Sequence, residues 1–255
     1  MKKAFSIFIM DVTNSSKFEN DLELTNYLSF WEKTLNEMKE FCNISAKHRM
    51  GDEIICVVDN HYAALMISYY MIYNWRYKDF MPYFGVALGE RDGEVTDIDI
   101  WNHPIIKKAR QANEKIKKDA NRESLIALEV PSNFTPLAID LDILFTLQTN
   151  LIINQTDKQR EILGLYSLLN SQKKIADFLA KKPPTISNHF KKGHVEIILK
   201  TSENILSYLR MGQIKWLSQE TEKEDVEHLT TISTEFEDMN QKIKEYLLMR
   251  LRSVQ

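Results

Sequence analysis

The sequence predicts an α+β domain followed by an all-helical region, and three observations lead to this prediction. Segments rich in β-branched and aromatic residues occur only before Pro131, where they alternate with segments of helical periodicity. Beyond Pro136, apolar residues recur at the spacing of three and four that is typical of amphipathic helices. The 255 residues are 44% hydrophobic, which is enough to form a core. The net charge of −3 excludes a nucleic-acid-binding protein that is basic over its whole surface.

Five strands are expected in the first part of the chain. The first is an apolar run that includes Asp11 near its end and is followed by the turn-forming residues 13–16. The next two form a hairpin with Gly51 and Asp52 at its tip. The expected strands are Phe5–Val12, Ile44–Arg49, Ile54–Val58, Pro82–Gly89 and Leu125–Leu128.

Three helices are expected among these strands. The first spans Asp21–Phe41, the second begins at Asn60 or His61 and reaches about Trp75, and the third is the basic segment Pro104–Lys118. The order strand–helix–strand–strand–helix–strand is that of a ferredoxin-like antiparallel sheet with helices on one face. The sequence therefore predicts this sheet for the first domain.

A cluster of turn-forming residues from Pro131 to Pro136 marks the expected domain boundary. We expect an α+β domain over residues 1–133, a helical domain over residues 137–215 and a C-terminal helix over residues 220–255. The helices expected after the boundary are Leu141–Asn154, Asp157–Leu169, Lys173–Leu179, Thr185–Lys192, Val195–Met211 and Val226–Arg252.

The segment from Gln172 to Phe190 has the spacing of a helix-turn-helix motif. Pro183 and Pro184 cannot continue the preceding helix, so they force a break. Ile186 and Phe190 are four residues apart and are expected to face the core. This spacing leaves outward a set of side chains that can bond base edges or phosphates from the major groove: Thr185, Ser187, Asn188, His189, Lys191 and Lys192.

Charge favours double-stranded DNA as the partner of this motif. Between Asn170 and Lys200, seven lysines outnumber two acidic residues within an acidic chain. The alternative is a helical hairpin that binds protein or only packs. The tail helix carries an apolar stripe from Val226 to Leu251, which predicts either an oligomerisation surface or a helix folded back onto its own domain. Because duplex operators are usually read by dimers, we favour a homodimer.

Two acidic residues mark a candidate metal site in the first domain. Asp11 ends the first strand and Asp52 lies at the tip of the hairpin, which the expected topology places beside that strand. Two carboxylates there can hold Mg²⁺ or Mn²⁺ against a triphosphate. The backbone amides of Val12–Ser15, expected to open a helix, can cradle a phosphate.

These segments resemble the class III nucleotidyl cyclase fold, which also underlies GGDEF domains. Phe8–Val12 resembles the family's first strand with its metal aspartate, Arg49–Glu53 resembles its metal-binding hairpin, and Tyr83–Glu90 resembles its next core strand. The segment from Asp99 to Arg110 resembles the one that holds a base-reading acid and an arginine. The resemblance implies that Asp99 contacts the base of a purine nucleoside triphosphate and that Arg110 stabilises the transferring phosphate.

The chain departs from the cyclase pattern at two positions. The family's catalytic asparagine corresponds to Ile106, which cannot orient a ribose or a phosphate. Its base-selecting lysine corresponds to His48, which is flanked by Lys47 and Arg49. The resemblance therefore implies nucleotide and metal binding more strongly than cyclase activity, with Ser15, Lys47, His48 and Asp99 as the candidate nucleotide-binding residues.

Taken together, both halves of the chain are similar to the SatD-like family of bacterial proteins, over roughly residues 3–200. The first hypothesis is a DNA-binding regulator whose first domain senses a nucleotide or dimerises. The second is an active nucleotidyl cyclase with a DNA-binding appendage, and the third is an interaction protein with a degenerate catalytic fold.

We expect a cytoplasmic protein with no membrane partner, because the longest apolar run, Tyr62–Tyr73, is too short to cross a bilayer. Cys42 and Cys56 are expected to be buried thiols.

Overall fold

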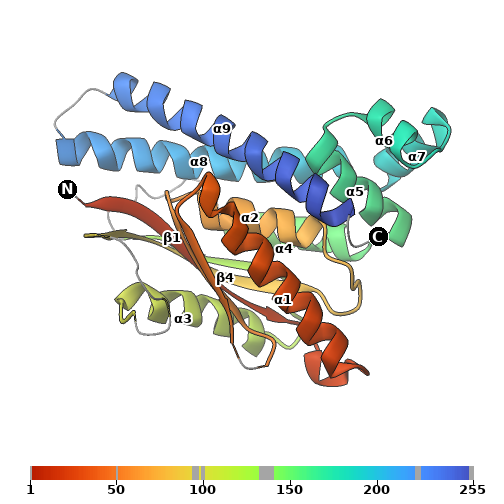
Figure 1. The fold of residues 1–255 in the computed structure, drawn as a ribbon, viewed down its shortest axis with the longest axis horizontal. Coiled ribbons are helices and arrows are strands. Elements are labelled where there is room, and N and C mark those ends of the chain that lie inside the picture. Colours follow the sequence, from red (N-terminus) through yellow and green to blue (C-terminus); the bar gives the residue numbers. More distant parts are fainter. Residues whose placement is uncertain are drawn as a thin grey trace.

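The computed structural model describes residues 2–49, 51–93, 98, 101–131, 141–221 and 225–252, and it is a mixed α/β structure (Figure 1). The strands are β1 (Lys3–Val12), β2 (Ile44–His48), β3 (Ile54–Asp59), β4 (Pro82–Arg91) and β5 (Ile126–Glu129). The helices associated with the sheet are α1 (Asp21–Glu37), α2 (Ala63–Tyr73) and α3 (Pro104–Lys118), with 3-10 turns at Ser15–Lys17 and Met38–Glu40. The helices that follow are α4 (Leu141–Ile153), α5 (Asp157–Leu169), α6 (Gln172–Phe178), α7 (Pro183–Lys192), α8 (Val195–Thr221) and α9 (Asp225–Arg252).

The five strands form one sheet in the order β2-β3-β1-β4-β5. β1 is central and antiparallel to both neighbours, so that Phe8 lies opposite Cys56 on β3 and Val86 on β4. β5 is parallel to β4, with Phe84 opposite Ile126. The expectation of an antiparallel sheet is correct for the first four strands and wrong for the fifth. The physical reason is that α3 connects β4 to β5 as a crossover, which is the connection that a parallel pair requires.

Helices cover both faces of the sheet, whereas the sequence predicts helices on one face. α1 and α2 lie on one side of the sheet and α3 lies on the other (Figure 1). Gly85 on β4 permits this arrangement, because a Cβ atom at that position would lie 2.2 Å from the carbonyl oxygen of Ala109 on α3. The absence of a side chain at Gly85 therefore allows α3 to pack directly against the strand.

The residues of β1 contribute alternately to two apolar layers. Phe8 and Met10 pack beneath α1 and α2, whereas Phe5, Ile7 and Ile9 pack against α3. All five side chains are almost completely buried. Burial on both faces explains why this strand is a continuous apolar run in the sequence rather than an alternating one. Both cysteines are buried free thiols, as expected.

The helices of the second half pack on the sheet domain through α2, which contacts α5 and α8. The apolar core beneath α1 and α2 continues without interruption into α4–α9. Residues 132–140, on which the expected domain boundary falls, lie outside the described residues, so the domain limits stay a prediction. Within the described ranges, none of the helices has the length and hydrophobicity needed to span a bilayer.

The tail helix α9 folds back along α8 and over α2 (Figure 1). Phe236 lies edge-on to Tyr62, the residue before α2, with the ring centroids 5.2 Å apart. The Tyr70 hydroxyl of α2 donates to Asn240 Oδ1 at 2.5 Å. Near the end of α9, the Tyr246 hydroxyl donates a hydrogen bond to the Glu37 carboxylate on α1. Of the two alternatives for the apolar stripe, the described part of α9 therefore matches the helix that folds back onto its own chain.

Candidate functional site

Asp11 and Asp52 lie together at one end of the sheet. Asp11 is the penultimate residue of β1, and Gly51 turns the β2–β3 hairpin with a φ of +94°, in the region that favours glycine. The Asp52 side chain then reaches β1, where Oδ2 accepts a hydrogen bond from the Val12 backbone N–H at 3.2 Å. The strand order thus produces the proximity that the sequence predicts, because the hairpin pairs beside β1.

The Asp11 carboxyl is held in an environment that disfavours its negative charge. Burial raises the pKa of Asp11 to about 6, and the charges of Asp52 and Glu53 act in the same direction. Lys117 and a hydrogen bond from Asn113 act against the rise. Near neutral pH the pair of carboxylates carries adjacent negative charges, which a cation would stabilise.

The donor set fits the way in which Mg²⁺ binds proteins, through one or two carboxylates together with water and phosphate oxygens. Among the described residues there is no group of three or more His, Cys, Asp or Glu side chains arranged to hold a metal. The chain therefore offers two carboxylates rather than a complete protein cage. Metal binding at Asp11 and Asp52 stays a prediction.

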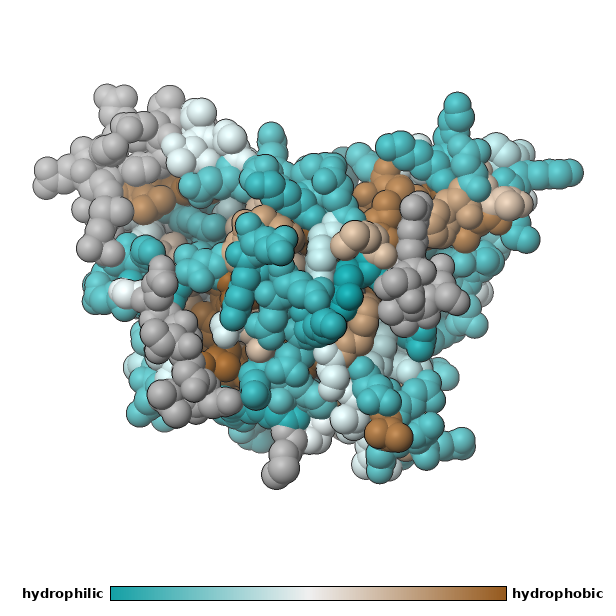
Figure 2. Space-filling view, viewed as in Figure 1, coloured by the Kyte–Doolittle hydropathy of each residue, from teal (hydrophilic) through white to brown (hydrophobic). Residues whose placement is uncertain are grey.

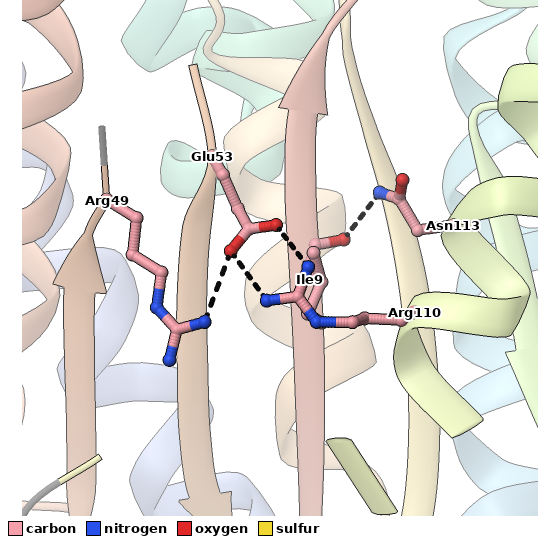
Figure 3. A network of polar contacts seen from close by, with 5 residues as sticks. All are labelled: Ile9, Arg49, Glu53, Arg110 and Asn113. Carbon is pink, nitrogen blue, oxygen red and sulfur yellow. Dashed lines mark hydrogen bonds and ion pairs between the residues drawn. The ribbon is translucent and has the colours of Figure 1, made fainter. Parts of the chain in front are cut away.

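Arg110, on α3, makes a bidentate ion pair with Glu53 beside the tip of the hairpin (Figure 3). Nη1 and Nη2 lie 3.0 and 3.1 Å from the two carboxylate oxygens. Arg49 also approaches Glu53, at 3.5 Å. The Arg110 guanidinium is thus paired with Glu53, a residue that sequence reasoning did not single out. The position of Glu53 directly after Asp52 is the sequence feature that could have indicated a role for it.

Asn113 ties α3 to the central strand one turn after Arg110. Its side-chain amide is buried and donates to the Ile9 carbonyl at 3.0 Å (Figure 3). Sequence reasoning missed Asn113 as well, although an asparagine within the apolar stripe of a basic helix is a recognisable signal. This bond and the close contact at Gly85 fix the position of α3, and hence of Arg110.

Several of the predicted nucleotide-binding residues are placed differently from the expectation. The expected amide cradle at Val12–Ser15 is wrong in part, since the Val12 N–H bonds Asp52 and the Thr13 N–H donates to the Met81 carbonyl at 2.8 Å. The chain forms a short 3-10 turn at Ser15–Lys17 after β1, where a helix was expected. The Val12 and Thr13 amides already have hydrogen-bond acceptors within the protein.

Two of the predicted nucleotide-binding side chains, Lys47 and His48, lie on the hairpin strand β2. His48 Nε2 lies 3.1 Å from the Gly51 carbonyl, so this side chain closes the hairpin, whereas Lys47 is exposed. Ile106 is half-buried and packs against the apolar layer beneath α3. Asp99 lies outside the described residues. The structure brings Asp11 and Asp52 together, pairs Arg110 with Glu53, and does not describe the predicted base-reading acid.

Helices α5, α6 and α7 form a compact three-helix unit. Thr156 caps α5 with a capping box, in which its side chain and that of Gln159 each accept a hydrogen bond from the other residue's backbone N–H. α6 contributes buried Ile175 and Ala176 to the centre of the unit, and α7 contributes Ile186 and Phe190. The burial of Ile186 and Phe190 is as the sequence predicts.

The opposite side of α7 is polar. Thr185, Asn188, Lys191 and Lys192 are exposed, whereas Ser187 and His189 are half-buried. Phe190 anchors the buried side against Tyr166 of α5, with the rings 4.7 Å apart. The exposed set therefore projects from a helix whose orientation is fixed by its apolar side.

Comparisons of the chain with protein-family models, with curated proteins and with solved structures found no match. Function is therefore inferred from the carboxylates near Arg110 and from the polar face of α7.

Proposed function

We propose that this protein is a DNA-binding regulatory protein in which α5–α7 form a helix-turn-helix and α7 enters the major groove. The observation that carries the proposal is the division of α7 into two sides. Ile186 and Phe190 bury one side, while the other presents Thr185, Asn188 and Lys191 to solvent. Hydroxyl, amide and ammonium groups of this kind bond phosphates and base edges.

The position and charge of the unit support the same function. α6 and α7 project at one end of the molecule, away from the sheet (Figure 1). The segment from Asn170 to Lys200 has seven lysines and two acidic residues within a chain of net charge −3. A local excess of positive charge on an accessible helix is the electrostatic footprint of a nucleic-acid-binding surface. We propose that the protein acts on double-stranded DNA as a homodimer, which sedimentation at several concentrations would test.

The salt dependence of DNA binding tests the role of α7. Fluorescence anisotropy with a labelled random-sequence duplex would compare wild type with Lys191→Ala/Lys192→Ala between about 50 and about 200 mM salt. Each phosphate contact contributes about 0.9 to the slope of log K against log salt, so the double variant should lower the slope by about 1.8. The matched control is Lys117→Ala/Lys118→Ala, an adjacent pair on α3 across the sheet. Equal slopes in the α7 variant and wild type would contradict the proposal.

For the first domain, the proposed function is binding of Mg²⁺ or Mn²⁺ together with a nucleotide. A ferredoxin-like arrangement is supported by the antiparallel order β2-β3-β1-β4. The resemblance to class III cyclases is supported by the proximity of Asp11 and Asp52 and by the pairing of Arg110 with Glu53, whose charge also acts on Asp11. Asp11 and Asp52 would hold the cation, which would supply positive charge for phosphate oxygens. Arg110 would contribute to phosphate binding after separation from Glu53.

Calorimetry with each nucleoside triphosphate in the presence of Mg²⁺ tests this site. Asp11→Asn/Asp52→Asn removes both carboxylates while keeping their shape and should abolish Mg²⁺-dependent binding. Asp79→Asn/Asp92→Asn removes the same charge at two exposed positions and is the control. Unchanged affinity in the first variant would exclude the site.

Nucleotidyl cyclase activity is the second candidate function, because Asp11 and Asp52 lie together and Arg110 pairs with Glu53, whose charge also acts on Asp11. Ile106 in place of the family's asparagine weighs against it. Incubation of the purified protein with the four nucleoside triphosphates and Mg²⁺ or Mn²⁺, followed by mass spectrometry, distinguishes the two functions. A cyclic nucleotide product would establish catalysis, and its absence alongside nucleotide binding would favour a sensing role.

A further inference from the structure

A cavity of about 270 Å³ lies where the sheet domain, the three-helix unit and the tail helix meet. Its walls come from α1, the connection after α2, α5, α6 and the last turns of α9. Hydrophobic surface is visible where the C-terminal part of α9 meets α5 (Figure 2). The volume is slightly below the ~300–1,000 Å³ that is usual for ligand pockets, so the cavity suits a small ligand.

The cavity has an aromatic wall. Tyr27 and Phe30 of α1 lie with their ring planes 9° apart and their centroids 6.2 Å apart. Trp75 continues the wall, with its ring 4.8 Å from that of Tyr27. Leu248 of α9 and Leu165 of α5 add aliphatic surface. These side chains provide flat apolar surfaces suited to a ring.

Arg160 in the first turns of α5 provides a buried positive charge. Its side chain is only 7% exposed, and Nη2 makes one long hydrogen bond of 3.5 Å to the Trp75 carbonyl. Nη1 is buried and has no hydrogen-bond partner among the described residues. A buried guanidinium nitrogen without an acceptor is destabilising, so an anionic acceptor in the cavity would satisfy it.

The other charges around the cavity also favour an anion. Arg76 and Lys78 line it together with Arg160, against Asp157 and Glu161. Glu161 is itself neutralised by an ion pair with Lys158. Three cationic side chains therefore outnumber Asp157, whose charge acts on Arg160, and a Glu161 that is already paired.

We propose that this junction cavity binds a small organic anion, specifically a carboxylate carried on an aromatic ring. The ring would lie against Tyr27 and Phe30, and the carboxylate would accept hydrogen bonds from Arg160. The cavity is separate from the carboxylates of Asp11 and Asp52, which repel anions, and it adds a second ligand site to the chain.

The position of Arg160 connects the ligand to the three-helix unit. α5 packs closely against the end of α2 at Gly164. A Cβ atom at this position would lie 2.8 Å from the Tyr73 carbonyl oxygen, so the absence of a side chain allows the contact. Phe178 of α6 and Leu251 of α9 also line the cavity. A ligand that orders these contacts would shift the position of α6 and α7, and this consequence rests on the proposed DNA-binding function.

Binding is tested without DNA, so that it can fail or succeed independently of the proposed function. Calorimetry and tryptophan fluorescence would follow titration with benzoate, phenylacetate and indole-3-acetate, each compared with its neutral amide. We expect at least one carboxylate to bind, and to bind about tenfold or more tightly than its amide, because only the carboxylate pairs with Arg160. Absence of binding by all three carboxylates, or equal binding of the amides, would overturn the proposal.

Two variants locate the site. Arg160→Gln should weaken carboxylate binding about tenfold or more, whereas Arg210→Gln, a matched change on α8 outside the cavity, should not. Leu165→Phe fills the cavity without a change in charge and should also weaken binding, which covers the case in which Arg160→Gln fails to fold. Undiminished binding in folded Arg160→Gln or Leu165→Phe would place the ligand elsewhere and refute the proposal. DNA affinity with and without the bound carboxylate then tests the coupling separately.

Discussion

The buried histidine His61 should make the stability of the protein sensitive to mild acid. Its ring is 1% exposed, and Nε2 donates to the Gly89 carbonyl at 3.0 Å. Its backbone N–H donates to Gln213 Oε1 at 2.7 Å, and the ring packs 5.6 Å from that of Trp216. His61 thus joins the sheet to α8 in its neutral form. Burial lowers its pKa to about 4, and the hydrogen bond to Gly89 and the charge of Glu90 act in the opposite direction.

The magnitude follows from the difference between the folded and unfolded states. The unfolded chain takes up a proton at this side chain below about pH 6.5, and the folded protein only near pH 4. The contribution of neutral His61 to the free energy of unfolding is therefore fully present above about pH 6.5 and is lost as the pH falls toward 4. The loss is about 2 kcal/mol at pH 5 and about 3 kcal/mol at pH 4.

The perturbation is His61→Gln, which removes the titrating group and retains a donor for the Gly89 carbonyl. Urea unfolding followed by circular dichroism would give the free energy of unfolding of both proteins from about pH 7.5 to about pH 5. The advantage of wild type over the variant should shrink by about 2 kcal/mol across this range. Asp11, with a pKa raised to about 6, has the opposite pH dependence, but it lies at the other end of β1 and is common to both proteins.

His194→Asn serves as the control, because His194 is exposed and its φ of +54° is one that asparagine tolerates. The difference between this variant and wild type should not change with pH. A constant difference between wild type and His61→Gln would refute the reasoning, since it would mean that the buried ring keeps its ordinary proton affinity.

Three other substitutions should change the free energy of unfolding in urea titrations. Gly85→Ala should destabilise the protein by about 3 kcal/mol, because the new Cβ would meet the Ala109 carbonyl oxygen at 2.2 Å; a neutral effect would contradict the close packing of α3. Thr156→Ala should lose about 1 kcal/mol with the capping box of α5, whereas Thr25→Ala, at an exposed position, should not. Asp11→Asn should stabilise the metal-free protein by about 1–2 kcal/mol above pH 6, because the raised pKa means that the ionised carboxyl opposes folding there; destabilisation would contradict this.

The candidate carboxylate site was predictable in part. Asp11 lies near the end of an apolar strand and Asp52 at the tip of a hairpin, and the strand–helix–strand–strand order places the hairpin beside β1. Glu53 was not predictable as the partner of Arg110, because these residues are far apart in the sequence and their pairing depends on how closely α3 approaches β4. The hydrogen-bond acceptors of the Val12 and Thr13 amides were not predictable, because the Asp52 carboxylate and the Met81 carbonyl come from segments distant in the sequence.

Local periodicity in the sequence determined where most elements lie and which sides of α6 and α7 are buried. Pro183 and Pro184 end the preceding helix, although α7 begins at Pro183 rather than at the expected Thr185. Ile186 and Phe190 define the apolar side of α7, because this feature depends on residues within a few positions of one another. Tertiary structure decided the parallel addition of β5, the placement of α3, the return of α9 along α8, and the cavity around Arg160. Each of these depends on contacts between residues distant in the chain, and the spacing of apolar residues along one segment does not specify which other segment will cover them.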